Sequence, residues 1–218
     1  MEFFQGSCIP AGEYSDSTMR CVKCGTYLTH AQEDYVVRFI PCDEEECWEC
    51  GRKLSIYGVV VDVRPDSEHL LDIANVKAAV WYHATNRENW MDGLMNYGKL
   101  HGSRTGYPLV HVGTLDAATS ILSDKYAGSD DWIYLYKVKL SPTAVLDPEL
   151  YEDENMWPRR TKDINVASNA FRYVNRYEAT GSISILMDPR QLIVESMDRL
   201  SPEQAQDMVR NCQNIRVH

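Results

Sequence analysis

Two pairs of cysteines have the spacing of metal ligands. Cys21 and Cys24 form the first C-x-x-C pair, and Cys47 and Cys50 form the second after 22 intervening residues. Each pair places two thiolates on one tight turn, and zinc takes four such ligands in a tetrahedron. A glycine directly follows each pair, which suits a turn whose backbone N–H groups point at sulfur. We therefore predict one structural zinc ion, bound by Cys21, Cys24, Cys47 and Cys50.

The cysteine segment resembles the zinc-ribbon family, in which the metal holds the fold together and performs no chemistry because no coordination position is open. The alternative is a set of free or redox-active thiols, which two similar pairs in one small module explain poorly. Cys42 lies outside both pairs, and it is either a replacement ligand or, as we favour, a buried thiol. Cys8 and Cys212 are interpreted as free cysteines.

Two further segments each carry a histidine and then a threonine at the end of an apolar run. In the first, His83 precedes Thr85 by two residues. In the second, His111 precedes Thr114 by three residues. Each threonine suits the N-cap of a following helix, where its oxygen satisfies an unpaired backbone N–H. Two such strand–His–Thr–helix units predict a pocket in which imidazoles, hydroxyls and helix N-termini converge on an anionic ligand.

These motifs resemble landmarks of the ADP-ribosyltransferase superfamily, which includes poly(ADP-ribose) polymerases and RNA 2′-phosphotransferases. The family's His-x-Thr/Ser motif is similar to Tyr82-His83-Ala84-Thr85, and its second landmark, a strand entering a Thr-capped helix, is similar to residues 111–118. The closing strand and its Asp-Pro-x-Gln turn resemble residues 182–193. The resemblance covers residues 80–195 and implies split, mainly antiparallel sheets around an NAD cleft.

The resemblance also implies roles for individual residues. In the family the His and the hydroxyl residue hold the nicotinamide-ribose of NAD, which assigns His83 and Thr85 to that contact. A carboxylate near the ribose stabilises an oxocarbenium-like transition state, as in glycosidases. We assign this second catalytic role to Glu178. In poly(ADP-ribose) polymerases the glutamate lies within the closing strand, five residues before the Asp, where this chain has Ile183.

Other residues near the motifs are candidate contacts of NAD: His111, Thr114, Arg104 and Tyr126. Guanidinium groups pair bidentately with phosphate oxygens. Pyrophosphate contacts are therefore sought among three arginines: Arg87, Arg104 and Arg172. Stacking on nicotinamide is sought among three tyrosines, at least two of which we expect to serve core or cross-strand packing instead: Tyr126, Tyr134 and Tyr136.

Hydrophobic periodicity and turn residues predict the elements that position these groups. We predict strands over 35–40, 54–63, 78–83, 109–112, 132–140 and 182–187. We predict helices over 67–77, 88–96, 115–123 and, from a capping box formed by Ser201 and Gln204, to about residue 211. Residues 146–169 are interpreted as an active-site loop or a partly helical segment.

The expected fold class is α+β in two parts. A turn at Arg64-Pro-Asp-Ser67 separates an N-terminal arm and zinc-ribbon module, residues 1–64, from a split-sheet ADP-ribosyltransferase-like domain with a C-terminal helix, residues 65–218. No apolar run approaches the roughly 20 residues of a membrane-spanning helix. The N-terminus also lacks the pattern of a signal peptide, so we expect a cytoplasmic protein with no membrane contact.

The net charge of −10 bears on the partners. Through Arg64 eleven acidic residues face six basic ones, which gives the first part a net charge of −5. Nucleic-acid backbones bind cationic surfaces, so this balance disfavours nucleic acid as a partner. The predicted function is NAD-dependent transfer of ADP-ribose to a macromolecular acceptor, and the expected partners are NAD and a protein acceptor or docking partner. The alternatives are a non-catalytic, zinc-stabilised nucleotide- or protein-binding adaptor and an RNA 2′-phosphotransferase.

Overall fold

The structure, a computed structural model, describes residues 17–38, 45–92, 109–126, 130–153 and 168–215. The chain divides into two compact units, Met1–Asp62 and Val63–His218. The boundary proposed from the sequence lies two residues further on. In the described part of the chain, no helix combines the length and apolar character that crossing a bilayer requires. The fold class is mixed α+β with several sheets, as expected.

The first unit is built around a two-stranded antiparallel sheet. Strands β1 (Met19–Cys21) and β2 (Val59–Val61) pair with Cys21 opposite Val59. A 3-10 turn, η1 (Ile56–Gly58), precedes β2, so only residues 59–61 of the strand predicted over 54–63 form a strand. The core of this unit joins apolar side chains to two of the predicted metal ligands: Met19, Cys21, Leu28, Val36, Cys47, Leu54 and Val59.

The strand predicted from residue 35 is wrong, because α1 (His30–Arg38) occupies that part of the chain. The helix begins with a capping box: the N–H of Gln32 donates to Thr29 Oγ1, and the N–H of Thr29 donates to Gln32 Oε1. The fixed helix start and the burial of Val36 outweigh the β-propensity of the Tyr-Val-Val run. Residues 39 and 40 of the predicted strand lie outside the described residues.

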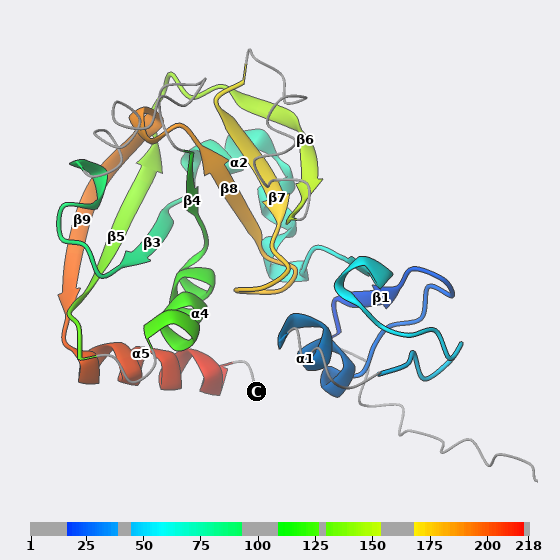
Figure 1. Cartoon of the computed structure of the whole chain (residues 1–218). Helices are drawn as coiled ribbons and strands as arrows, with labels where there is room; N and C mark the ends of the chain where they lie inside the picture. Colours follow the sequence, from blue (N-terminus) through cyan, green and yellow to red (C-terminus); the bar gives the residue numbers. More distant parts are fainter. Residues whose placement is uncertain (1–16, 39–44, 93–108, 127–129, 154–167, 216–218) are drawn as a thin grey trace, which may run out of the picture. The chain divides into compact units, whose positions relative to one another are not determined.

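The second unit contains two sheets, shown in Figure 1. The three-stranded sheet has the antiparallel order β3-β5-β9, with bounds Trp81–Thr85, Ile133–Leu140 and Leu192–Leu200. The four-stranded sheet has the order β4-β8-β7-β6, with bounds Val110–Val112, Ile183–Met187, Ala170–Val174 and Leu146–Glu152. The pairs β4·β8 and β7·β8 are antiparallel, and β6 and β7 are parallel.

One short bridge joins the two sheets. Tyr82 on β3 and Gly113, just after β4, exchange two backbone hydrogen bonds of 2.8 and 3.0 Å. A side chain at position 113 would not fit, because an added Cβ would lie 2.8 Å from Ala117 Cβ and 3.0 Å from Ser184 Oγ. The glycine in the His-Val-Gly-Thr segment therefore allows Ala117 and the β8 residue Ser184 to approach the backbone closely at this bridge.

The helices of the second unit that the structure describes in full are two longer ones, α4 and α5, and three shorter ones. Their bounds are Pro65–Leu71 for η2, Ile73–Ala78 for α2, Leu115–Tyr126 for α4, Pro189–Gln191 for η4 and Pro202–Ile215 for α5. The capping box predicted for α5 is present: the N–H of Ser201 donates to Gln204 Oε1, and the N–H of Gln204 donates to Ser201 Oγ. In Figure 1, α4 and α5 lie side by side and pack on the β3–β5 part of the three-stranded sheet.

Of the three apolar clusters in the described part of this unit, the two largest pack on the three-stranded sheet. The larger one contains Trp81, Tyr136 and Val138 of the three-stranded sheet and Ile185 and Met187 of the other. The smaller one lies on the opposite face of the three-stranded sheet, against α4 and α5. Strands β6, β7 and β9 were not predicted, and β6 replaces the first part of the segment that we expected to be a loop or partly helical. Residues 154–167 of that segment lie outside the described residues.

Candidate functional site

The four cysteines predicted as metal ligands lie together in the first unit. Cys21 Sγ is 3.7 Å from Cys50 Sγ, and Cys24 Sγ is 3.7 Å from Cys47 Sγ. All four sulfur atoms lie within 4.8 Å of one another. Tetrahedral Zn–S bonds of about 2.3 Å separate the sulfur atoms by about 3.8 Å. The sulfur positions therefore fit a four-thiolate zinc ion, and they are too far apart for disulfide bonds.

The two cysteine turns have the same backbone geometry. The N–H of Gly25 donates to the oxygen of Cys21, and the N–H of Gly51 donates to the oxygen of Cys47, at 2.8 and 2.9 Å. Both glycines have a positive φ, 75° and 62°, which a residue with a Cβ adopts at a cost. The repeat of one turn at both pairs is what brings four sulfur atoms to one point.

Helix α1 holds both sides of this cluster. The buried amide of Gln32 donates from Nε2 to the oxygen of Glu46, 2.6 Å away and next to Cys47. The carboxylate of Glu33 accepts hydrogen bonds from the N–H groups of Thr18 and Met19, both 2.9 Å, at the start of β1. Hydrogen bonds from Thr26 lower the pKa of the Cys24 thiol. The shift at Cys24 favours the thiolate form that zinc requires, whereas burial raises the pKa of the Cys47 thiol, which would lose its proton on binding the metal.

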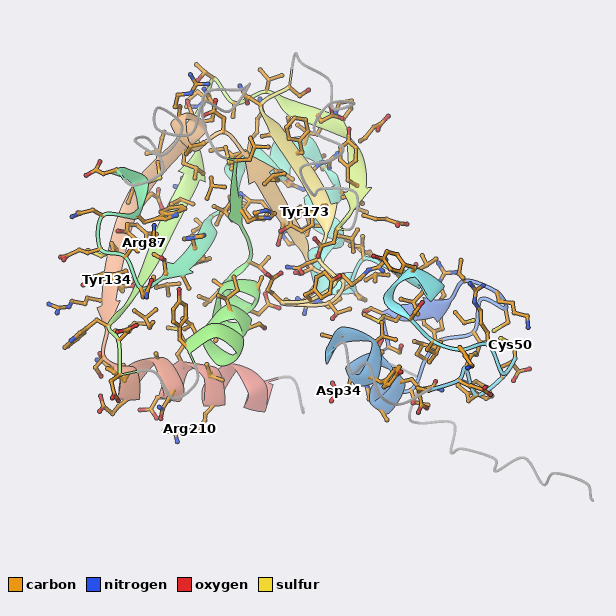
Figure 2. All side chains as sticks on the ribbon, viewed as in Figure 1. Asp34, Cys50, Arg87, Tyr134, Tyr173 and Arg210 are labelled. Atoms are coloured by element: carbon orange, nitrogen blue, oxygen red, sulfur yellow. The ribbon has the colours of Figure 1, made fainter. Side chains whose placement is uncertain are left out.

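Cys42, which was left open as a fifth candidate, lies outside the described residues, as does Cys8. Figure 2 labels Cys50 in the first unit, where its sulfur completes the cluster. With four sulfur ligands and tetrahedral spacing, the cluster suits a structural metal with no open position.

In the second unit, His83 lies on β3 with its ring held on two sides. Its Nδ1 lies 2.9 Å from the backbone oxygen of His111, and its ring stacks on Trp90 with centroids 3.9 Å apart and planes at 10°. A carbonyl oxygen can only accept a hydrogen bond, so Nδ1 carries the proton and Nε2 is the acceptor in the neutral ring. Thr85, also on β3, is buried and accepts a 3.3 Å hydrogen bond from the N–H of Arg87.

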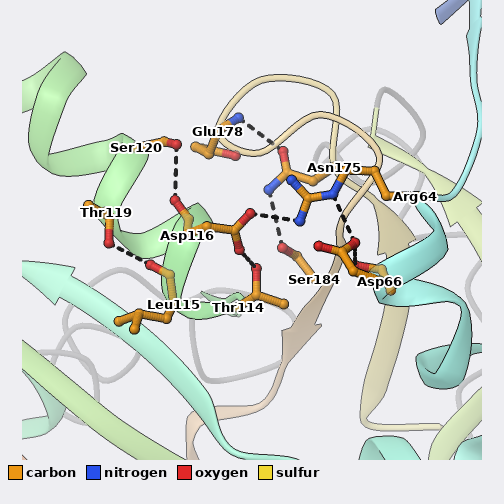
Figure 3. Close-up of polar contacts among 11 residues, drawn as sticks. Arg64, Asp66, Thr114, Leu115, Asp116, Thr119, Ser120, Asn175, Glu178 and Ser184 are labelled. Carbon is orange, nitrogen blue, oxygen red and sulfur yellow. Dashed lines mark hydrogen bonds and ion pairs between the residues drawn. The ribbon is translucent and has the colours of Figure 1, made fainter. Parts of the chain in front are cut away.

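His111 and Thr114 flank the junction with the other sheet. His111 is exposed on β4, and its Nδ1 lies 2.9 Å from the hydroxyl of Tyr173. Thr114 precedes α4, and its backbone oxygen accepts from the N–H of Ala118, as an N-cap residue does. Its hydroxyl donates to the carboxylate of Asp116, which is also 2.7 Å from Arg64 (Figure 3).

A cavity of about 360 Å³ lies beside this ion pair. Its walls come from η2, the start of β3 and the first residues of α4, and Thr114 is the predicted site residue among them. The charges of Asp66 and Asp116 are both offset by Arg64, at 3.1 and 2.7 Å.

Glu178 lies in the turn between β7 and β8. The side-chain oxygen of Asn175 accepts from the N–H groups of Tyr177 and Glu178, both 3.1 Å, and so fixes this turn. The Glu178 carboxylate contributes to raising the pKa of the buried Tyr173 hydroxyl, after the larger effects of burial and Asp153. Figure 3 shows Glu178 and Asn175 near the start of α4. Ile183, the residue five positions before Asp188, is fully buried.

The tyrosines proposed for stacking have packing roles. Tyr134 and Tyr136 are buried in the larger core cluster, and Tyr136 lies 5.2 Å from Trp90 between ring centroids. Burial is the main cause of the raised pKa of Tyr136, whose hydroxyl donates to the oxygen of Glu88. Tyr126 packs in the smaller cluster, and its hydroxyl accepts a 3.3 Å hydrogen bond from the N–H of Asn86.

Arg172 is not available as a phosphate contact. It is 3% exposed, and it donates to the backbone oxygens of Leu70, Leu71 and Pro148 at 3.3, 2.5 and 2.8 Å. Burial lowers its pKa. The side chain therefore ties η2 to β6 from the inside of the unit. Arg104 lies outside the described residues, and Arg87 is exposed near the end of β3, where Figure 2 labels it.

Sequence reasoning missed Tyr173, Ser184 and Trp90. Tyr173 and Ser184 are polar residues in strands whose every residue is buried. A polar residue within an otherwise apolar strand could have indicated them, because a buried polar group needs a hydrogen-bond partner. Trp90 falls in the predicted helix over 88–96, and no sequence signal indicates that it stacks on His83.

Comparison of the chain with protein-family models, with curated proteins and with solved structures found no match.

Proposed function

We propose that the protein transfers ADP-ribose from NAD to a macromolecular acceptor, with a zinc ion that stabilises its first unit. The observation that carries this proposal is the fixed ring of His83 beside the bridge between the two sheets. A hydrogen bond at Nδ1 and a stacked Trp90 set both its position and its tautomer. An imidazole held in this way can orient a ribose hydroxyl with little loss of entropy on binding.

In the proposed reaction, the bond between the nicotinamide nitrogen and the ribose carbon breaks. Nicotinamide leaves with the bonding electrons, and a nucleophilic atom of the acceptor bonds to the same carbon and loses its proton. Nε2 of His83, the acceptor nitrogen of this tautomer, takes a hydrogen bond from a ribose hydroxyl. Positive charge that develops on the ribose is stabilised by a nearby carboxylate.

Glu178 is the proposed carboxylate. Its turn is fixed by a hydrogen bond to the side chain of Asn175. Its carboxylate is close enough to Tyr173 to raise the pKa of that hydroxyl, which is hydrogen-bonded to His111. These contacts support a catalytic position for the Glu178 carboxylate at the end of the four-stranded sheet where β8 begins. Glu178 belongs to a turn and Ile183 to the strand, so the geometry of attack would differ from that of poly(ADP-ribose) polymerases.

One observation favours a second candidate, an adaptor that binds a nucleotide or protein without turnover. The position that carries the catalytic glutamate in poly(ADP-ribose) polymerases holds Ile183, which has no exposed surface. A chain that had kept the His83 site and lost the carboxylate would bind NAD and not cleave it. Removal of a 2′-phosphate from RNA is supported less, since the net charge is −10 and Arg172 is buried.

The proposal is tested with zinc-loaded protein and NAD labelled on the adenosine side. Nicotinamide release and label transfer are measured for the wild type, His83→Ala, Glu178→Gln and, as a matched control, the exposed Glu68→Gln. We expect turnover in the wild type and control, and loss of turnover in the other two. Turnover that persists in His83→Ala would contradict the proposal. Tight binding of NAD by the wild type without turnover would establish the adaptor instead.

A further inference from the structure

Two adjacent residues of helix α1 hold the two chain segments that carry the predicted zinc ligands. Gln32 Nε2 donates to the backbone oxygen of Glu46, the residue before Cys47. The Glu33 carboxylate binds the start of β1, the strand that ends at Cys21. Successive residues of an α-helix point about 100° apart, because 3.6 residues make one turn, so one helix can hold two segments at once.

Gln32 holds the hairpin that presents the second cysteine pair. Within this hairpin, Glu46 pairs with Lys53 in a β-bridge, and the N–H of Cys47 donates to the oxygen of Arg52 over 2.8 Å. Gln32 is buried, and its Nε2 lies 2.6 Å from the Glu46 oxygen. A buried amide donor and a carbonyl acceptor are each costly to leave unpaired, so this bond fixes where the hairpin, and Cys47 with it, lies on the helix.

Glu33 holds the strand that presents the first cysteine pair. One oxygen of its carboxylate, Oε1, accepts three hydrogen bonds, from the hydroxyl of Ser17 over 2.6 Å and from the N–H groups of Thr18 and Met19 over 2.9 Å each. Hydrogen bonds to an ionised acceptor are roughly twice as strong as those between neutral groups. Met19 is fully buried and β1 runs from it to Cys21, so the carboxylate fixes the course of the strand into the first pair.

We infer that Gln32 and Glu33 are positioning residues of the metal site, which set its affinity for zinc by holding the two cysteine pairs at tetrahedral spacing. Each sulfur–sulfur distance of 3.7 Å joins a cysteine of one pair to a cysteine of the other, so this spacing depends on both segments. Zinc has to order four ligands, and α1 bears part of that ordering through hydrogen bonds that do not involve the metal. The inference does not depend on NAD, because it concerns the metal site of the first unit.

Zinc affinity is measured on the full chain by competition with a chromophoric zinc chelator. Gln32→Met keeps the approximate size of the side chain and removes the donor to Glu46, and Glu33→Ala removes the acceptor at β1. We expect each variant to bind zinc about 10-fold to 100-fold more weakly than the wild type, the range for partners that orient metal ligands. Glu33→Gln keeps an oxygen that accepts the same bonds without the charge, so its affinity should lie between those of the wild type and Glu33→Ala.

Thr29→Ala is the matched control for a general loss of helix stability. Thr29 Oγ1 caps α1 by accepting from the N–H of Gln32, and its removal leaves the bond between Gln32 Nε2 and the Glu46 oxygen in place. We expect its zinc affinity to remain close to that of the wild type. Wild-type affinity in Gln32→Met and Glu33→Ala, or an equal loss of affinity in Thr29→Ala, would overturn the inference.

Gln32→Glu provides a second variant if Gln32→Met folds poorly. It keeps the oxygen that accepts from the N–H of Thr29 and turns the donor facing Glu46 into an acceptor, so we expect the same loss of zinc affinity. Cobalt(II) is bound in place of zinc to check each variant, because its visible absorption depends on its coordination geometry. Tetrahedral absorption retained in a variant that binds more weakly would show that the site still forms and that only its affinity has changed.

Discussion

His83 donates from Nδ1 to the backbone oxygen of His111 over 2.9 Å, next to the bridge that joins the two sheets of the second unit. One bond thus serves two purposes. It ties β3 to β4 beyond the Tyr82–Gly113 pair, and it makes Nε2 the hydrogen-bond acceptor of the neutral His83 ring. The two purposes can be separated by substitution.

Asparagine at position 83 should keep the structural bond and remove the ligand contact. Its Nδ2 takes the place of the imidazole Nδ1, and it has no group at the position of Nε2. We expect His83→Asn to retain the free energy of unfolding within about 1 kcal/mol. NAD turnover should fall about 100-fold or more, since the ribose is no longer oriented.

Urea denaturation and nicotinamide release measure these two quantities. The exposed His69→Asn is the control and should change neither. Wild-type turnover in His83→Asn would show that the ring contributes only to the fold.

The cysteine cluster should bind one zinc ion per chain. Among the described residues, the cluster consists of four cysteines at tetrahedral spacing, and no fifth residue in it could replace a missing ligand. We expect Cys24→Ser to lose stoichiometric zinc in elemental analysis and to expose the first unit to limited proteolysis, as chelation of the wild type should. Cys8→Ser is the control, because Cys8 belongs to neither pair. Full zinc content in Cys24→Ser would contradict the four-cysteine site.

Gly113→Ala should destabilise the second unit by about 1–3 kcal/mol, the range for overpacking. The added Cβ would lie 2.8 Å from Ala117 Cβ, which belongs to α4 and cannot rotate away. The double variant Gly113→Ala/Ala117→Gly removes that obstacle. Its loss of unfolding free energy should therefore be smaller than the sum of the losses of the two single variants. A double-mutant cycle in urea measures this coupling. Strict additivity would show that the contact is relieved in another way.

Arg172→Met should destabilise the second unit by about 2–4 kcal/mol. The substitution keeps the apolar stem and leaves three backbone oxygens without their donor, and buried unsatisfied acceptors are costly. Arg210→Met is the control, because Arg210 and its partner Asp207 are both more than half exposed. The control should change stability by less than about 0.5 kcal/mol. Equal changes in the free energy of unfolding for the two substitutions, measured by urea denaturation, would contradict the structural role of Arg172.

Local sequence signals predicted the elements whose ends carry a cap or a turn. The Ser201 capping box predicted α5, and the paired C-x-x-C turns predicted a cluster of four sulfur atoms. The same kind of signal was available at Thr29 and Gln32 and was missed, because the following Tyr-Val-Val run was read for its β-propensity alone.

Other features depend on contacts between distant parts of the chain. Strand β9 is exposed along most of its length and lacks apolar alternation, and it forms because β5 pairs with it over eight positions. Arg172 looked like a surface cation in sequence, and only the fold shows three carbonyl groups around it. Likewise, the link between Tyr173 and His111 joins residues 62 positions apart, which no local pattern encodes.

Binding of NAD to the zinc-loaded wild type and to His83→Asn, measured by isothermal titration calorimetry, tests the central claim most directly. The account predicts saturable binding near one NAD per chain in the wild type and a loss of affinity of at least about 10-fold in the variant, which is about 1.4 kcal/mol. No heat of binding in a correctly folded, zinc-loaded wild type would contradict an NAD site at His83.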